Sequence, residues 1–314
     1  MRNIDEVLKV LPKCISSVIE NGINSIDRIK EIRLRVNRWI VVNCDEREIV
    51  LTEKLGGIRL TVENLRDCVK SVSEYSIYAY EDNISQGFIT IKGGHRIGFS
   101  GKVNKEAGKI KSIRNITFIN IRIAREIKGC ADGILPYLFD GERILNTIII
   151  SPPGGGKTTL LRDVTRQLSD GWGNEKQCQQ GLSVGVVDER SEICACYRGI
   201  PQNDVGLRTD VYDNCSKAEG IYRLIRSMSP KVVAVDELGT KEDVVAVRYA
   251  IVSGCAVIAT VHGSSVEDIC NNHLLFEMID RSLFQRYVLL TDKCRTGHVC
   301  EIRDADRGVI FDGN

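Results

Sequence analysis

The sequence predicts an α/β protein in which a smaller α+β domain, residues 1–132, precedes a larger domain, residues 133–314. Two observations carry this prediction. The first domain combines helical periodicity with short strands broken by glycines and polar turns, which indicates an antiparallel sheet. The second domain alternates strands with helices, which indicates a parallel sheet covered by helices on both faces. The length of 314 residues agrees with about two domains.

Composition argues against several classes of protein. The chain has 43 Lys and Arg against 42 Asp and Glu, so it lacks the basic surplus of a protein that coats nucleic acid. Its 12 cysteines include no C-x-x-C pair, and Met1–Lys13 lacks the apolar core of a signal peptide. The longest apolar stretch, Val244–Val261, contains Arg248 and Gly254, which indicates helix, turn and strand rather than a membrane span. We therefore expect a cytoplasmic protein that reaches membranes only through partners.

The N-terminal domain is predicted to open with helix and to continue mainly as strands. Apolar residues from Ile4 to Ile19 recur at helical spacing. Ile32–Val36 alternates with a period of two, with two arginines on one face and three aliphatic side chains on the other. Thr61–Asn64 resembles a capping box that begins a helix. Further strands are expected at Trp39–Asn43, Phe88–Ile91, Arg96–Phe99 and Ile116–Ile123, and a polar turn at Asn104–Lys111.

The second domain is predicted to alternate strands and helices. Strands are expected at Ile144–Ile150, Val184–Asp188, Val232–Val235 and Ala256–Val261. Helices are expected at Thr158–Leu168, Lys217–Met228 and Glu242–Val252, with a long loop at Tyr197–Asp213. A closing hairpin region is expected at Tyr287–Leu290, His298–Ile302 and Gly308–Phe311. Because parallel strands end at the same sheet edge, polar residues that follow these strands should meet there.

The strongest functional signal is the glycine-rich segment Ser151–Thr159, which lies between a buried strand and a helix. Glycines let backbone N–H groups surround a phosphate, and the helix N-terminus adds partial positive charge. Lys157 is expected to reach the β- and γ-phosphates, and the Thr158 hydroxyl to hold Mg²⁺. The pattern departs from G-x-x-x-x-G-K-[ST] at its first position, which is Ser151. The predicted nucleotide-binding residues are Pro153, Gly154, Gly155, Gly156, Lys157, Thr158 and Thr159.

Two more strands end in carboxylates at the same predicted sheet edge. Val232–Val235 is followed by Asp236, expected to position Mg²⁺, and by Glu237, which could activate the attacking water. Val184–Val187 leads to a second acidic segment that contains Glu189. The sequence leaves both glutamates as candidates for the general base, with a preference for Glu237.

A third strand end carries His262, where a polar side chain could contact the γ-phosphate and report its loss. Other phosphate-loop classes fit less well. The base-reading motif of GTPases is out of place, the signature of transporter ATPases is missing before Asp236, and no arginine-rich kinase lid is evident. What remains is a RecA-like P-loop ATPase core.

The second domain resembles the type II and type IV secretion ATPases, which include the pilus motors. The shared order is phosphate loop, acidic box, Asp-Glu strand and histidine box, here Gly154–Thr159, Asp188–Glu192, Val232–Glu237 and Thr260–Gly263. The whole chain is more similar to the stage III sporulation protein AA family, through Ile32–Arg35, Gly94–Gly98, Ser112–Asn115, Phe118–Ala124, Asp188–Ile193 and Arg226–Pro230.

This resemblance implies a mother-cell ATPase that acts with the channel joining mother cell and forespore. It also implies a ring of identical subunits, expected to be a hexamer, docked on membrane-embedded channel proteins at the mother-cell side of the forespore membrane. In ring motors an arginine from a neighbouring subunit stabilises charge on the transferred phosphoryl group. Arg114, Arg122 and Arg125 are candidates for this role, in cis or in trans.

The expected activity is Mg²⁺-dependent ATP hydrolysis that powers or gates a channel complex. Two alternatives stay open. The first is a RecA-like nucleic-acid translocase, which the near-neutral charge disfavours. The second is a nucleotide switch that binds without hydrolysis.

Overall fold

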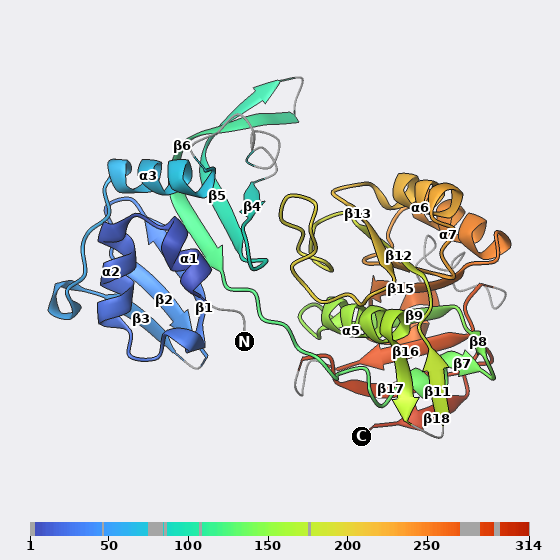
Figure 1. Ribbon diagram of the computed structural model, residues 1–314. Helices are drawn as coiled ribbons and strands as arrows, with labels where there is room; N and C mark the ends of the chain where they lie inside the picture. Colours follow the sequence, from blue (N-terminus) through green and yellow to red (C-terminus); the bar gives the residue numbers. More distant parts are fainter. Residues whose placement is uncertain are drawn as a thin grey trace. The chain divides into compact units, whose positions relative to one another are not determined.

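The computed structural model describes residues 4–45, 47–74, 84, 87–106, 109–174, 177–270, 283–291 and 296–313. Residue contacts divide the chain into two units, whose elements are labelled in Figure 1. The first unit comprises Met1–Glu126 together with Ala195–Gln202, and the second comprises Ile127–Cys194 and Asn203–Asn314. The grouping of Ala195–Gln202 with the first unit is a feature that no sequence pattern indicated.

The first unit is built on a six-stranded antiparallel sheet in the order β3-β2-β1-β6-β5-β4. Its strands are β1 (Ile29–Arg35), β2 (Ile40–Cys44), β3 (Glu48–Leu51), β4 (Phe88–Thr90), β5 (Arg96–Glu106) and β6 (Lys109–Arg122). Its helices are α1 (Asp5–Val10), α2 (Lys13–Gly22) and α3 (Val62–Val72), with 3₁₀ turns η1 (Ile26–Arg28) and η2 (Glu53–Leu55). The predicted α+β character of this region is therefore confirmed.

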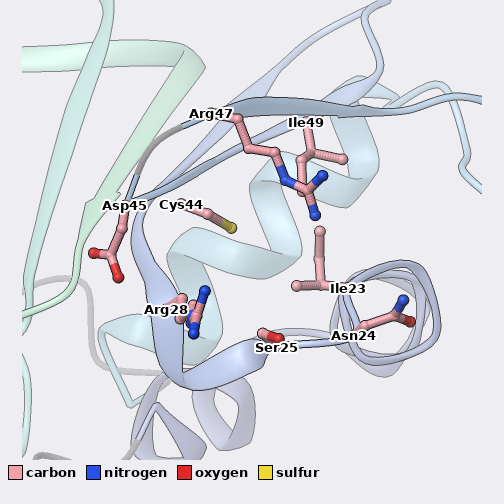
Figure 2. A pocket seen from close by; sticks show the side chains of 8 residues that line it. All are labelled: Ile23, Asn24, Ser25, Arg28, Cys44, Asp45, Arg47 and Ile49. Carbon is pink, nitrogen blue, oxygen red and sulfur yellow. The ribbon is translucent and has the colours of Figure 1, made fainter.

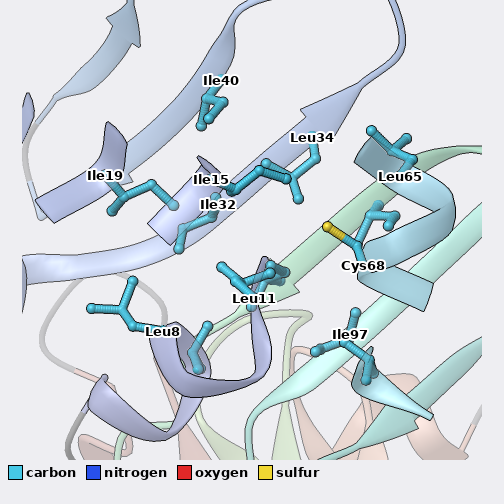
Figure 3. Close-up of a cluster of buried hydrophobic side chains, with 14 of the residues drawn as sticks. Leu8, Leu11, Ile15, Ile19, Ile32, Leu34, Ile40, Leu65, Cys68 and Ile97 are labelled. Carbon is cyan, nitrogen blue, oxygen red and sulfur yellow. The ribbon is translucent and has the colours of Figure 1, made fainter. Parts of the chain in front are cut away.

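The core of the first unit follows from the period-two pattern of β1. Ile32 and Leu34 are fully buried, whereas Arg33 and Arg35 alternate with them and lie on the other face. Figure 3 shows the buried side chains of the strands meeting apolar residues of the helical segment, among them Ile15 and Ile19. The predicted division of this strand into an apolar and an arginine face is confirmed.

Helix α3 begins with the predicted capping box. The Asn64 backbone N–H donates to Thr61 Oγ1 at 3.2 Å, and the Thr61 backbone N–H donates to Asn64 Oδ1 at 2.9 Å. Each side chain thus satisfies a backbone donor that the start of the helix leaves without an intrahelical partner. Asparagine therefore replaces the usual glutamate at this position without loss of the reciprocal bonds.

The polar turn expected at Asn104–Lys111 is wrong in extent, because β5 continues to Glu106 and β6 begins at Lys109. The register of the pairing between β5 and β6 shifts on both sides of Gly101 and again between Asn104 and Lys105. At Gly101 a Cβ atom would lie 2.5 Å from the carbonyl oxygen of Asn115, so the two backbones meet where only glycine fits. Cross-strand bonds therefore extend this hairpin beyond its apolar residues.

The second unit is built on an eight-stranded sheet in the order β13-β12-β14-β15-β9-β16-β17-β18. Its strands are β9 (Thr147–Ser151), β12 (Val184–Asp188), β13 (Thr209–Asp213), β14 (Val232–Val235), β15 (Ala256–His262), β16 (Arg286–Leu290), β17 (Val299–Arg303) and β18 (Val309–Asp312). The first six in spatial order are parallel, and β17 and β18 are antiparallel. Smaller elements are η4 (Leu135–Leu138) and the hairpins β7 (Phe139–Asp140) with β8 (Arg143–Ile144) and β10 (Gly171–Asn174) with β11 (Gln177–Gln180).

Among the residues that the structure describes, four helices accompany this sheet, namely α5 (Lys157–Asp170), α6 (Lys217–Ser227), α7 (Lys241–Val252) and α8 (Val266–Cys270). The crossover through α5 runs from β9 to β12, whereas those through α6 and α7 run in the opposite direction across the sheet. Because such crossovers are right-handed, α5 covers one face and α6 and α7 cover the other. Ile221 of α6 and Val244 of α7 share a buried cluster with alternate residues of the central strands. The predicted α/β class, with both faces covered, is confirmed.

Three local expectations for the second unit need correction. The strand expected at Ile144–Ile150 is divided into β8 and β9 at Asn146, whose buried Oδ1 accepts a hydrogen bond from Val257 N at 2.9 Å. Strand β13 lies inside the expected loop Tyr197–Asp213, where half-buried residues give no apolar alternation. The hairpin of β10 and β11 was also not anticipated.

The long apolar stretch Val244–Val261 is a helix, a turn and a strand, as predicted. Helix α7 ends at Val252, Gly254 has a φ of 87° in the turn, and β15 follows from Ala256. Among the residues that the structure describes, no helix is both long and apolar enough to cross a lipid bilayer.

Candidate functional site

The glycine-rich segment joins the end of β9 to the start of α5. Gly154 and Gly156 have φ values of 81° and 96°, which side chains rarely allow. At Gly156 a Cβ atom would also lie 2.3 Å from the backbone nitrogen of Gly297, which donates a hydrogen bond to the Gly155 carbonyl at 3.0 Å. Ser151 is buried at the end of β9 and donates to the Pro152 carbonyl at 2.8 Å. The loop is therefore shaped both by its own glycines and by a distant turn.

The first turn of α5 is suited to an anion. Gly156 is its N-cap, no side chain caps the helix, and no acidic residue lies in the first turn. The early backbone N–H groups and the positive end of the helix dipole are therefore available for a phosphate. Pro153 and Gly154 are exposed at the rim of the loop, and Thr158 and Thr159 are half-buried in the first turn. These residues fit the phosphate groups of a nucleotide.

Glu237 is surrounded by positively charged or hydrogen-bonding groups. Its Oε1 lies 2.7 Å from Lys157 Nζ and 3.0 Å from His262 Nε2, and its Oε2 lies 3.0 Å from an Arg190 guanidinium nitrogen. Burial raises the pKa of Glu237, but the hydrogen bonds and charges of these neighbours outweigh burial and hold its pKa below the ordinary value. The carboxylate is therefore ionised at neutral pH and is shared between the phosphate loop and the end of β15.

The backbone at Glu237 has a φ of 55°, in the left-handed region that residues other than glycine seldom adopt. This turn follows β14 directly, and the Glu237 N–H donates to Thr260 Oγ1 at 2.9 Å. Strain of this kind costs on the order of 1–3 kcal/mol and persists only where the surroundings enforce it. Here the contacts with Lys157 and Thr260 hold the side chain toward the loop.

Asp236 faces two hydroxyl groups. Thr158 Oγ1 donates to its Oδ2 at 2.5 Å, and Thr260 Oγ1 donates to its Oδ1. Carboxylate and hydroxyl oxygens are the ligands that Mg²⁺ prefers, so Thr158 and Asp236 fit such an ion. Thr260 was not among the predicted site residues, although it opens the histidine box in the sequence.

The two candidate bases have different partners. Glu237 contacts Lys157 of the phosphate loop, whereas Glu189 pairs with Lys217 at the start of α6. Both glutamates, together with Asp236 and Arg190, line one small cavity of about 20 Å³. This volume is sufficient for about one water molecule. The structure therefore brings both candidates to the same small space but ties only Glu237 to the phosphate loop.

Asp188, at the end of β12, is the most strongly perturbed carboxyl group of the site. Burial raises its pKa to about 6, although the backbone N–H groups of Glu192 and Cys194 donate to it at 2.9 and 2.7 Å. These bonds shape the acidic segment that carries Glu189 and Arg190. Arg162 of α5 holds the same segment by donating to the Glu192 and Ile193 carbonyls, each at 2.6 Å. The segment is therefore bonded directly to the helix that follows the phosphate loop.

The raised pKa of Asp188 predicts a pH-dependent difference between the protein and its Asp188→Asn variant. A carboxyl group whose pKa is higher in the folded state stabilises that state fully at pH values below the pKa of the unfolded state, which is 3.8 for Asp188. This stabilisation is lost as the pH rises through the folded-state pKa of about 6. We expect the unfolding free energy of the protein to fall by about 2 kcal/mol, relative to the variant, between pH 4 and pH 7. Urea titrations at several pH values measure this difference, and parallel curves would contradict the assignment.

The candidate arginines lie in the first unit, whereas the phosphate loop lies in the second. Arg114 is exposed on β6 opposite Lys102, and Arg122 is exposed at the end of β6 opposite Glu31 and Arg96. Arg125 donates to Asp45 Oδ1 at 2.6 Å. All three candidate arginines are therefore exposed side chains of the first unit.

Comparison with known proteins gives the following relatives. A family model described as "Sporulation stage III, protein AA" matches residues 1–310. Stage III sporulation protein AA of Bacillus subtilis (strain 168) is 40% identical over 312 residues, which cover 98% of this chain and 97% of that protein. Protein SEEDLING PLASTID DEVELOPMENT 1 of Arabidopsis thaliana is 23% identical over 275 residues, which cover 86% of this chain and 35% of that protein.

Two solved structures share the fold. The pilus retraction motor PilT with bound ADP has a TM-score of 0.59 and 16% identity, covering 90% of this chain and 77% of that one. The ATPase DotB of Legionella pneumophila has a TM-score of 0.57 and 16% identity, covering 89% and 76%. The fold class predicted from the sequence, a RecA-like P-loop core preceded by a smaller α+β domain, is confirmed, because the chain shares the fold of these two ATPases.

Proposed function

This chain belongs to the stage III sporulation protein AA family, and from that premise we propose that it is a Mg²⁺-dependent ATP hydrolase. Its turnover would power or gate a channel complex between mother cell and forespore. The observation that carries the proposal is the meeting of Lys157 and Thr158, from the phosphate loop, with Asp236 and Glu237, from the end of β14. These are the residue types and positions that ATP hydrolysis requires.

Binding of ATP at the loop begins with an exchange of partners. The backbone N–H groups at the start of α5 and the Lys157 ammonium bind the phosphates, so Lys157 leaves Glu237. Glu237 then loses its closest positive partner, its pKa rises toward the ordinary value, and it becomes a better proton acceptor. A Mg²⁺ ion held by Thr158 and Asp236 would supply charge neutralisation at the phosphates. Glu237 orients the attacking water and accepts its proton, with Glu189 as the alternative base.

His262 is proposed as the residue that responds to the γ-phosphate. Its Nε2 lies 3.0 Å from the same Glu237 oxygen that Lys157 contacts, so both side chains depend on the position of one carboxylate. When Lys157 moves to a phosphate, Glu237 Oε1 loses its contact with the lysine. The position of the Glu237 carboxylate then changes, and the contact between His262 and this carboxylate changes with it. Its exposed ring at the end of β15 could transmit that change to a neighbour.

We propose that the protein works as a ring of identical subunits, a hexamer, in which an arginine completes the site.

The candidates for this arginine are Arg114, Arg122 and Arg125, each of which can be changed to Ala. The variant that lacks the residue reaching the phosphates is expected to lose ATP turnover about 10²- to 10³-fold. Arg38→Ala, at an exposed arginine of the same unit, serves as the control. Asp45→Asn removes the ion-pair partner of Arg125 but keeps the Arg125 guanidinium. Comparing it with Arg125→Ala shows whether turnover depends on the guanidinium or on the ion pair. Unchanged hydrolysis in all three alanine variants would remove the arginine proposal.

The working protein is proposed to lie in the cytoplasm of the mother cell and to dock on membrane-embedded proteins of the sporulation channel.

Turnover that needs Mg²⁺ and stops with a chelator supports the hydrolase. Turnover that rises only with added single-stranded or duplex DNA would favour a nucleic-acid translocase. Tight ATP binding with no turnover, alone and with membranes from sporulating cells, would favour a nucleotide switch.

A further inference from the structure

A second pocket lies in the first unit, apart from the phosphate loop. It is bounded by the turn between α2 and β1 and by the end of β2 and the start of β3, and its volume is about 480 Å³. Pockets that bind small molecules range from roughly 300 to 1,000 Å³. Its size is therefore suited to a small organic molecule rather than to a single ion.

Two arginines give this pocket its charge. Figure 2 shows the guanidinium groups of Arg28 and Arg47 approaching the same space from opposite sides. Within the described ranges neither has a carboxylate partner at ion-pair distance, although both are fully charged at neutral pH. Two positive groups that face one cavity repel each other unless an anion lies between them.

The acidic residue of the lining does not neutralise these arginines. Asp45 Oδ1 lies 2.6 Å from Arg125 and 3.4 Å from Lys30 Nζ, and Figure 2 shows its carboxylate directed away from Arg47. The hydrogen bond from Arg125 and the neighbouring Lys30 hold the pKa of Asp45 below its ordinary value. Its charge is thus already matched by two cations, and the pocket stays positive.

The rest of the lining is mixed. Ile23 is buried and Ile49 is half-buried, so both offer apolar surface to the cavity. Ser25 and Asn24 add a hydroxyl and an amide at the exposed rim. A ligand that suits this lining has an anionic group for the arginines and an apolar or planar part for the isoleucines.

We propose that this pocket binds a small organic phosphate, with the guanidinium groups of Arg28 and Arg47 on its phosphate and Ile23 and Ile49 against its organic part. A phosphate monoester has three free oxygens around a tetrahedral centre, so two guanidinium forks can bind it from different sides. A carboxylate has only two oxygens in one plane and suits a single fork better. The site is separate from the nucleotide site and does not depend on hydrolysis.

The test is calorimetric titration of the full chain with phenyl phosphate, carried out on the Lys157→Ala variant so that the phosphate loop contributes less binding. We expect saturable binding with one site per chain. Arg28→Gln and Arg47→Gln should each weaken it about 10- to 100-fold, since each removes a charged hydrogen bond. Arg38→Gln, an exposed arginine outside the pocket, should leave it unchanged.

Two further arms separate ligand binding from a structural role of the arginines. Asp45→Asn removes the nearby negative charge and should tighten binding several-fold, which a merely destabilised fold would not do. Arg28→Lys and Arg47→Lys keep the charge but lose the fork, so they should bind with intermediate affinity if the glutamine variants fail to fold. The proposal is overturned if benzoate binds as tightly as phenyl phosphate, if the arginine variants bind like the control, or if no binding occurs up to millimolar phenyl phosphate.

Discussion

Glu237→Gln is expected to reduce ATP turnover about 10²- to 10⁴-fold while tightening the binding of ATP. The amide cannot accept a proton from water, so the chemical step is lost. The amide also cannot form an ion pair with Lys157. In the unchanged protein the Lys157 ammonium lies 2.7 Å from the Glu237 carboxylate, and the Lys157 side chain is only 10% exposed. ATP then no longer competes with Glu237 for Lys157, and its dissociation constant should fall several-fold. Single-turnover hydrolysis and equilibrium binding measure the two effects separately.

The matched variant is Glu189→Gln, which removes the same charge from the same cavity. Because Glu189 pairs with Lys217 rather than with the phosphate loop, its replacement should leave the affinity for ATP nearly unchanged and lower turnover much less. The reverse order, with turnover lost in Glu189→Gln and kept in Glu237→Gln, would assign the base to Glu189. Tighter ATP binding in both variants alike would contradict the proposed exchange of partners at Lys157.

Lys157→Ala is expected to abolish both tight ATP binding and turnover, with a loss of at least about 100-fold in turnover. The variant removes the one side-chain cation of the loop that can reach the phosphates, whereas the backbone N–H groups stay in place. Glu237 keeps His262 and Arg190 as partners, so the fold should tolerate the change. Lys241→Ala, at an exposed lysine that begins α7, is the control. Retained turnover in Lys157→Ala would place hydrolysis outside this loop.

Local sequence patterns were sufficient to predict many of the elements of the fold. The alternation at Ile32–Val36 predicted which side chains of β1 are buried, and Thr61 and Asn64 predicted the start of α3. The phosphate loop was visible because all its residues are consecutive and lie between a strand and a helix. Each of these features depends on residues that are close together in the chain.

Features that join distant segments were not predictable in this way. Gly297 fits against Gly156, and Thr260 bonds to Asp236 and to the Glu237 backbone, but no spacing in the sequence connects these residues. Arg190 was not among the predicted site residues, whereas the structure pairs it with Glu237, 47 positions away. Strand β13 was missed because pairing with β12, rather than its own composition, makes it a strand.

In the proposed ring, the chain hydrolyses ATP at sites that neighbouring subunits complete. The most direct test is ATP turnover per subunit as a function of protein concentration, with Mg²⁺ present and Lys157→Ala as the blank. We predict turnover above the blank that rises steeply with concentration, in step with assembly measured by light scattering. Turnover no higher than the blank at every concentration, or turnover that stays constant while the assembly dissociates on dilution, would contradict the claim.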